Sequence, residues 1–211
     1  MSSVLALLAA YLLGALPFGY ILARWVSGTD IRKAGSGNIG ATNVFRTAGP
    51  AAGLATLALD MGKGYLAVWL AGRLTSGNIV LMSMAALAAI VGHAFPVFLK
   101  FRGGKAMATY VGAFLCLTPI PVAAMLVVFL VTVVYSRHIS VGSILGAGTL
   151  PLAEWLIERP PPFVLLASVV AGAFVIGRHR ANIRRLREGT ERVFTLSSKG
   201  RSKYMNWYTL L

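Results

Sequence analysis

Long apolar runs separated by short polar segments dominate this sequence. The runs cover residues 3–26, 51–73, 79–99, 106–136, 141–157 and 163–177. Residues 3–23 carry no charged side chain. At about 1.5 Å per residue, a helix of this length crosses the ~30 Å hydrocarbon core of a bilayer. The pattern therefore predicts an all-α integral membrane protein.

The fourth apolar run, 106–136, is too long for one ordinary span, and the sequence TPIP at 118–121 interrupts it. Proline removes a backbone donor and disfavours helix in the residue before it. We therefore divide this run into two short helices, which gives seven transmembrane helices in all. The first of the two is preceded by RGGK at 102–105, and we expect it to begin inside the membrane as a half-helix.

The basic residues decide between six and seven spans. They cluster at 24–46, at 100–105, at Arg137 and from Arg178 to Arg192, while the intervening loops hold only Arg73 and Arg159. With seven spans, every cluster falls on one membrane face, whereas six spans put the C-terminal cluster on the other face. Because Lys and Arg concentrate on the cytoplasmic side of membrane proteins, we expect the N-terminus outside and the C-terminus in the cytoplasm.

Composition supports this class of protein. The chain has 211 residues, of which 57% are hydrophobic and 12% charged, whereas soluble domains have about 25% charged residues. The net charge of +14 would suggest nucleic acid in a soluble protein. No nucleic-acid-binding motif accompanies it, so we assign the charge to anionic membrane lipid and expect no nucleic-acid partner. The one cysteine, Cys116, permits no internal disulfide.

The first of four polar segments reads GSGNIGATNVFRTAG and covers residues 35–49. We interpret it as a loop. Its glycines let backbone amides turn toward an anion, and Arg46 supplies a guanidinium fork suited to phosphate. Further hydrogen-bonding groups come from Ser36, Asn38, Thr42 and Asn43. A flexible connector would have the same composition, so the residues alone leave both interpretations open.

The second segment, LDMGKG at 59–64, lies well inside an apolar run. Asp60 and Lys63 are three residues apart, so they share a helical face and can pair. An unpaired charge costs about 2.5–3.5 kcal/mol at the centre of a membrane helix. We favour a structural ion pair between helices over a ligand site, because a neutralised pair binds either charge poorly.

The third segment, GHAFPVFLKFRGGKAMAT at 92–109, places Gly103 and Gly104 before Lys105 at a helix start. Exposed amides, the positive end of a helix dipole and one ammonium group together favour phosphate binding. The spacing differs from that of a Walker A motif. We interpret His93 as a buried core histidine.

The fourth segment, GRHRANIRRLREGTE at 177–191, has helical spacing that brings His179, Asn182 and Arg185 near one side. Anchoring on anionic lipid accounts for many of its arginines, but not for His179 and Asn182. Ser143 lies near the end of another apolar run, where serine at a helix contact is the default interpretation.

Several chemistries lack their motifs in this sequence. No cluster of His, Cys and carboxylate residues predicts a metal site, and no Gly-x-Ser-x-Gly elbow is present. None of the three histidines is followed five residues later by Asp, so the acyltransferase signature of that form is absent.

Taken together, the four segments resemble those of the bacterial membrane acyl-phosphate:glycerol-3-phosphate acyltransferases. The resemblance runs from about residue 10 to about residue 191 and rests on GSGNIGATNVFR, DMGKG, GHAFPVFLKFRGGKAMAT and HRANIRRLREGTE. It implies an enzyme of the bacterial inner membrane whose site faces the cytoplasm. Such an enzyme moves a fatty acyl group from long-chain acyl phosphate to the 1-hydroxyl of glycerol 3-phosphate, giving lysophosphatidic acid and phosphate. This is the first acylation step of phospholipid synthesis, with no cofactor or metal and with a separate phosphate acyltransferase making the acyl phosphate.

The resemblance also implies roles for individual residues. Those expected to bind glycerol 3-phosphate and carry the catalysis are Ser36, Arg46, Lys105 and His179, with Asn182 as a further contact. Those expected around the acyl-phosphate head are Asn38, Thr42, Asn43, Gly103, Gly104 and Ser143. Those expected to support the site are Asp60, Lys63, His93 and Glu191. The proton acceptor is either His179 or a phosphate oxygen of the donor, and the resemblance favours the second, substrate-assisted route without a protein nucleophile.

We expect residues 1–196 to form a single transmembrane acyltransferase domain. Residues 197–211 match none of the family's segments and are either a native tail or a remnant of cloning. Two other classes remain open. A transporter of an organophosphate would also need buried cations, although the polar segments crowd one membrane face. A purely structural or lipid-binding anchor would explain the tail arginines but not Arg46.

Overall fold

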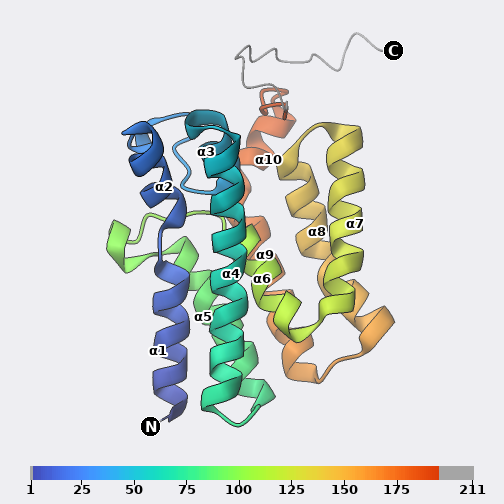
Figure 1. The fold of residues 1–211 in the computed structure, drawn as a ribbon. Helices are drawn as coiled ribbons and strands as arrows, with labels where there is room; N and C mark the ends of the chain where they lie inside the picture. Colours follow the sequence, from blue (N-terminus) through green and yellow to red (C-terminus); the bar gives the residue numbers. More distant parts are fainter. Residues whose placement is uncertain (1, 195–211) are drawn as a thin grey trace.

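The first apolar run does not form one continuous helix. In the computed structural model, which describes residues 2–194, α1 (Ser2–Ala15) ends before Pro17 and α2 (Phe18–Ser27) begins after it (Figure 1). Pro17 lacks the amide N–H that a helix interior requires. The span expected over 3–26 is therefore present with a break in the helix at its centre. Gly28, at φ 65°, ends α2 in the left-handed conformation that glycine adopts without strain.

The segment interpreted as a loop at 35–49 is partly helical. A short 3₁₀ turn at Ile31–Lys33 is followed by an irregular stretch and then by α3 (Ala41–Ala48), which carries Arg46. Gly49, at φ 94°, separates α3 from α4 (Pro50–Leu74), and Pro50 opens α4 at a position where its missing N–H costs nothing. The loop expectation holds for residues before Ala41 and is wrong for α3.

The remaining helices follow the apolar runs closely. Asn78 caps α5 (Ile79–Ala94) by accepting a hydrogen bond from the Leu81 amide. Thr118 separates α6 (Met107–Leu117) from α7 (Pro119–Ser136), which confirms the division of 106–136. The chain continues through α8 (Ile139–Ala153), a π-helical turn at Glu154–Glu158, α9 (Pro162–Arg178) and α10 (Arg180–Arg187).

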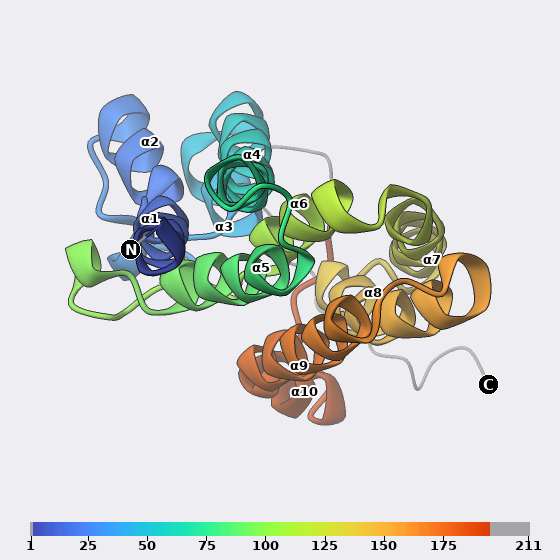
Figure 2. The same cartoon turned by 90° about the horizontal axis from the view of Figure 1, so that it is seen from below.

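Helix α6 lies at the centre of the bundle. Seen from below, it lies between α4 on one side and α7 and α8 on the other, while α5 packs directly against α9 (Figure 2). Gly64 of α4 lies directly against Thr109, and Gly112 of α6 lies against Met61, because neither glycine has a Cβ to keep the backbones apart. Helix α6 spans 11 residues, about 16 Å, so it starts beside the middle of α4 and covers only the lower half of the bundle in Figure 1.

Several helices are long and apolar enough to cross a membrane. By length and composition these are Ser3–Ser27, Ile79–Leu99, Pro119–Ser136 and Ile139–Glu158, with α9 and α10 as a fifth if the pair, bent by 54°, counts as one span. Helix α4 carries three charged residues and α6 is short, which separates them from this group. The outward faces of α1, α7 and α9 expose large side chains such as Leu12, Leu130 and Leu166, which suits contact with lipid.

Candidate active site

Polar side chains gather at two levels of this apolar bundle. One cluster lies in the middle, where α4, α5 and α6 meet. The other lies at the end of the bundle where α3 and α10 are found, at the top of Figure 1. The two clusters differ in how far their polar groups are already paired.

The middle cluster is closed in charge, because one lysine neutralises one carboxylate, although Asp60 Oδ1 accepts no hydrogen bond within residues 2–194. The Lys63 ammonium nitrogen lies 2.7 Å from Asp60 Oδ1 and donates a hydrogen bond of 2.8 Å to the Leu16 carbonyl. This carbonyl lies at the break between α1 and α2 and also accepts from the Phe18 amide at 3.1 Å. His93 Nδ1 lies 3.2 Å from the Thr109 hydroxyl and 3.6 Å from Asp60 Oδ1. The charged residues and His93 are all buried. The ion pair expected from the spacing is therefore present, and His93 is a core histidine.

Gly103 and Gly104 fix the loop that carries Lys105. Their amides donate to the carbonyls of Ala94 and His93, at 3.2 Å each. The His93 ring fills the space that a Cβ on Gly104 would need. The expectation that these two amides are free for a phosphate is therefore wrong, because the protein backbone already uses them. The glycines instead hold the Lys105 loop against α5, and their place beside the acyl-phosphate head stays a prediction.

Arg178 holds the same loop from the other side. Its Nη2 and Nε donate to the Gly104 carbonyl at 3.0 and 3.2 Å, and its guanidinium lies 5.1 Å from the centre of the Phe95 ring. A groove of about 480 Å³ opens beside it, with Phe95 and Phe174 among its lining residues. No sequence pattern predicts this contact, since Arg178 is one of many arginines in the tail.

Asn43 organises the turn that precedes α3. Its side-chain NH₂ donates to the carbonyls of Ala34 at 3.0 Å and Asn38 at 2.8 Å, and its Oδ1 accepts from the Ser36 amide at 2.9 Å. Asn38 Oδ1 accepts from the Gly40 amide at 2.8 Å. Asn43 is buried and its polar atoms shape the turn, while its predicted contact with acyl phosphate stays a prediction. The Ser36 side chain lies exposed on that turn.

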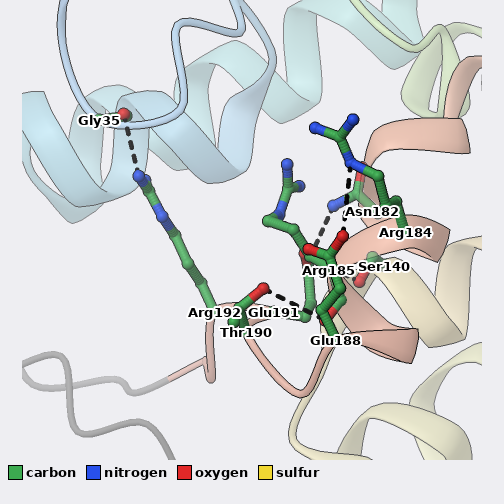
Figure 3. A network of polar contacts seen from close by, with 9 residues as sticks. All are labelled: Gly35, Ser140, Asn182, Arg184, Arg185, Glu188, Thr190, Glu191 and Arg192. Carbon is green, nitrogen blue, oxygen red and sulfur yellow. Dashed lines mark hydrogen bonds and ion pairs between the residues drawn. The ribbon is translucent and has the colours of Figure 1, made fainter.

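Glu191 connects α8 to α10 (Figure 3). Its Oε1 accepts from the Ser140 hydroxyl at 2.8 Å and from Asn182 Nδ2 at 2.6 Å, and its Oε2 accepts from Arg185 Nε at 2.7 Å. Burial opposes ionisation of Glu191, yet these three hydrogen bonds hold the pKa of its carboxyl below its usual range. The site-support role expected for Glu191 fits this geometry.

Two acceptor atoms remain unused near Glu191. Asn182 Oδ1 is buried and has no hydrogen-bond partner within residues 2–194. His179 Nδ1 lies 2.8 Å from the Val175 carbonyl. A carbonyl only accepts, so Nδ1 carries the hydrogen and Nε2 of the neutral ring is an acceptor. Burial lowers the pKa of His179 to about 4, and the Lys105 charge acts in the same direction, so the ring is neutral at physiological pH.

Positive charges surround these acceptors. Burial lowers the pKa of Lys105 to about 8; the charges of Arg185, Arg46 and Arg178 also lower it, and Glu191 opposes them. Burial and the charge of Arg192 lower the pKa of Arg46. Within the described part of the chain, four guanidinium groups and one ammonium thus act on each other around one carboxylate. Such an excess of cations favours a bound anion of high charge, such as a phosphate group.

The remaining predicted residues lie near this end without a decisive contact. Thr42 lies in the first turn of α3 and is half-buried, and Ser143 is buried on α8, one turn beyond Ser140. Their predicted contacts with the acyl-phosphate head stay predictions. The structure thus brings Lys105, Arg46, His179 and Asn182 into one electrostatic cluster, while Asp60, Lys63 and His93 form a separate one behind the Lys105 loop.

Comparison with known proteins identifies the family. A family model described as glycerol-3-phosphate acyltransferase matches residues 4–189. The chain is 47% identical over 190 residues to the glycerol-3-phosphate acyltransferase of Desulforamulus reducens, covering 90% of this chain and 94% of that protein. The chain belongs to the glycerol-3-phosphate acyltransferase family. Another member, glycerol-3-phosphate acyltransferase 2 of Moorella thermoacetica, is 47% identical over 188 residues, 89% of this chain and 95% of that protein.

Solved structures of the glycerol-3-phosphate acyltransferase family share this fold. The chain resembles the crystal structure of PlsY (YgiH), an integral membrane glycerol 3-phosphate acyltransferase, in its glycerol 3-phosphate form. The TM-score is 0.88 and the identity 35%, covering 92% of this chain and 96% of that one. The lysophosphatidic acid form gives 0.86 and 34%, over 93% and 97%. This glycerol-3-phosphate acyltransferase is therefore an all-α, multi-pass integral membrane protein. The family model ends at residue 189, so Glu191 and the residues after it lie outside the matched segment.

Proposed function

We propose that this family member transfers a fatty acyl group from acyl phosphate to the 1-hydroxyl of glycerol 3-phosphate, giving lysophosphatidic acid and phosphate. The observation that carries the proposal is the unfilled, buried Oδ1 of Asn182 beside the cluster of cations. Glycerol 3-phosphate offers one phosphate group, which needs cations, and two hydroxyl groups, which need acceptors. Asn182 Oδ1 and His179 Nε2 supply such acceptors, and leaving the buried Asn182 Oδ1 without a partner is costly.

Arg46 and Lys105 are the proposed phosphate ligands. A guanidinium fork and an ammonium group form charge-assisted hydrogen bonds to phosphate oxygens, which are stronger than neutral ones. The exposed hydroxyl of Ser36 lies on the turn before α3, and we assign it to the same substrate. Bound phosphate would offset the repulsion that lowers the pKa of Arg46 and Lys105.

We further propose seven membrane-crossing elements. These are α1 with α2, α4, α5, the half-helix α6, α7, α8 and α9. The basic residues of α3 and α10 lie at one end of the bundle, and the positive-inside tendency assigns that end to the cytoplasm. The N-terminus is then outside. The relatives come from bacteria, which favours the bacterial cytoplasmic membrane and a site open to soluble glycerol 3-phosphate.

The acyl donor requires both a phosphate site and an apolar surface. The groove beside Arg178 combines aromatic walls with a guanidinium group, and outward-facing apolar side chains cover the helices around it. An acyl phosphate could therefore keep its chain in the lipid while its head reaches the Lys105 loop. Because acyl phosphate must be made elsewhere, we also propose a functional link to a separate enzyme that makes it.

The chemistry needs no protein nucleophile. Acyl phosphate is an activated mixed anhydride, so the substrate hydroxyl oxygen attacks the acyl carbon directly. A new C–O ester bond forms, the C–O bond to phosphate breaks, and the hydroxyl proton leaves with the phosphate. Holding the hydroxyl near the carbonyl contributes up to about 7–11 kcal/mol in favourable cases. The cations stabilise the tetrahedral oxyanion and the departing phosphate.

The geometry of His179 bears on the identity of the proton acceptor. With a pKa of about 4, its ring is a weak base at neutral pH. The phosphate oxygens of the donor gain basicity as the bond to the acyl carbon breaks, so the departing phosphate is the stronger acceptor. We therefore propose substrate-assisted catalysis, in which His179 Nε2 accepts a hydrogen bond from the substrate hydroxyl and orients it.

Purified protein in detergent micelles tests the reaction. It would be incubated with glycerol 3-phosphate and either palmitoyl phosphate or palmitoyl-coenzyme A, and lysophosphatidic acid and free phosphate would be quantified. We expect product from palmitoyl phosphate and a loss of about 10²–10³-fold in kcat/KM in Arg46→Ala and Lys105→Ala. Arg73→Ala, at the opposite end of the bundle, is the matched control. Absence of ester from both donors in a folded preparation would refute the proposal.

A further inference from the structure

The segment that follows α10 crosses between the two sides of the candidate site. Glu191 faces α8 and α10, whereas Arg192 Nη2 donates a hydrogen bond of 3.1 Å to the Gly35 carbonyl, on the turn that carries Ser36 (Figure 3). The Phe194 ring centre lies 5.8 Å from that of Phe45 on α3, and the Phe194 amide donates to the Arg137 carbonyl at 2.8 Å. We call residues 191–194 the clasp.

We propose that the clasp is a positioning element for glycerol 3-phosphate binding and that Arg192 is its positioning residue. The proposal rests on the function proposed above. The site is built from two separate parts, the turn and α3 on one side and α8, α9 and α10 on the other. Arg192 joins the carbonyl next to Ser36 to a backbone that Glu191 fixes to Ser140 and Asn182.

The Ser36 turn needs such an external restraint. Gly35 has φ +60°, and Asn43 Oδ1 occupies the space where a Cβ would stand, so the turn adopts a conformation that glycine alone takes without strain. Within the turn, the Ser36 amide donates to Asn43 and the Gly37 amide to the Ala34 carbonyl. These bonds set its shape, whereas the Arg192 contact sets its position against α10.

Charge gives the clasp a second effect on the same site. Arg192 acts on the guanidinium of Arg46 as a like charge, and Phe194 packs beside Phe45, the residue before Arg46. A hydrogen bond to Gly35 keeps Arg192 directed toward the turn in spite of this repulsion. The clasp therefore positions both Ser36 and Arg46, and it does so with residues beyond the segment that the family model matches.

Arg192→Gln tests the proposal against Arg187→Gln. Arg187 is exposed on α10 and has no side-chain hydrogen bond or ion pair within residues 2–194, so its loss removes charge alone. We expect the KM for glycerol 3-phosphate to rise about five-fold in Arg192→Gln, the size of effect that losing one such hydrogen bond gives. The KM for acyl phosphate and the melting temperature would stay unchanged, and Arg192→Lys would recover part of the loss.

Hydrogen exchange of the full-length protein gives a readout independent of turnover. The amides of Ser36 and Gly37 would exchange several-fold faster in Arg192→Gln and at the wild-type rate in Arg187→Gln. If the KM for glycerol 3-phosphate rose without faster amide exchange, Arg192 would act through its charge and not by positioning the turn. If exchange became faster while the KM stayed unchanged, the clasp would have no part in substrate binding. Either result overturns the proposal. Failure of the wild type to acylate glycerol 3-phosphate would refute the proposed function instead, and the exchange data would still report on the clasp.

Discussion

The two polar clusters of this protein follow opposite electrostatic arrangements. In the middle of the bundle, Asp60 and Lys63 neutralise each other at 2.7 Å. His93 Nδ1 lies 3.2 Å from the Thr109 hydroxyl and 3.6 Å from Asp60 Oδ1. At the end of the bundle, cations outnumber the carboxylate and Asn182 Oδ1 has no partner within residues 2–194. The first cluster is neutral, because the Lys63 charge lies against Asp60 Oδ1, although that oxygen accepts no hydrogen bond within residues 2–194. The second keeps an excess of cations beside a buried acceptor, and we propose that glycerol 3-phosphate completes it.

The difference separates scaffold from binding site within one chain. Buried polar groups cost stability unless they are paired, so an unpaired set persists where a ligand completes it. The two clusters are nevertheless connected, because the Gly104 amide donates a hydrogen bond of 3.2 Å to the His93 carbonyl. The closed cluster therefore supports the backbone from which Lys105 reaches the open one.

The largest expected effect concerns the closed cluster. Lys63→Met leaves the Asp60 carboxylate buried without its partner, and breaking a buried ion pair from one side costs about 3–5 kcal/mol. We expect a large fall in melting temperature for Lys63→Met. The double variant Asp60→Asn with Lys63→Met should recover most of it, because no uncompensated charge remains. Thermal unfolding in detergent measures both.

A control for this comparison comes from the open cluster. Lys105→Met also removes a lysine, but one already surrounded by like charges, so stability should hold or rise while activity is lost. If Lys63→Met and Lys105→Met destabilised the protein equally, the division into scaffold and binding site would be wrong.

The second expected effect is a pH dependence of substrate binding. The pKa of Lys105 is lowered to about 8 in the folded protein without substrate, so its charge disappears as pH rises through 8. We expect kcat/KM for glycerol 3-phosphate to fall up to ten-fold per pH unit above that value. Lys105→Arg, which keeps its charge, should flatten this limb of the profile.

Unfolding does not account for that loss. A lysine has a pKa of about 10.4 when unfolded, so between pH 8 and that value the unfolded chain binds more protons at this position than the folded one. Stability from this group therefore rises with pH across the window. A fall in melting temperature that tracked the fall in activity would contradict the assignment to Lys105.

Sequence patterns predicted the parts of this structure that local rules govern. The spacing of Asp60 and Lys63 predicted their pair, and the proline-rich sequence at 118–121 predicted the boundary between α6 and α7. Each of these depends on residues close together in the chain.

The errors and omissions depend on contacts between distant segments. Glycine amides at 103 and 104 resemble a phosphate cradle in sequence, but their partners are carbonyls of α5, whose position no local pattern specifies. The residue type of Asn43 suggests a substrate ligand, whereas its hydrogen bonds to Ala34, Ser36 and Asn38 appear only in the folded turn. In the sequence, nothing distinguishes Arg178 and Arg192 from the other arginines of the tail. Only the folded chain shows that their side chains donate hydrogen bonds to the carbonyls of Gly104 and Gly35.

The smallest expected effect compares the histidines of the two clusters. If a phosphate oxygen of the donor takes the proton, His179 only orients the substrate hydroxyl, and His179→Gln should lower kcat less than about ten-fold while raising the KM for glycerol 3-phosphate. A general base contributes about 10²–10⁴-fold, so abolished turnover with unchanged substrate affinity would make His179 the base. His93→Gln is the matched variant, because its ring packs against Gly104 in the closed cluster. It should lower stability, and it should affect activity only through the position of Lys105.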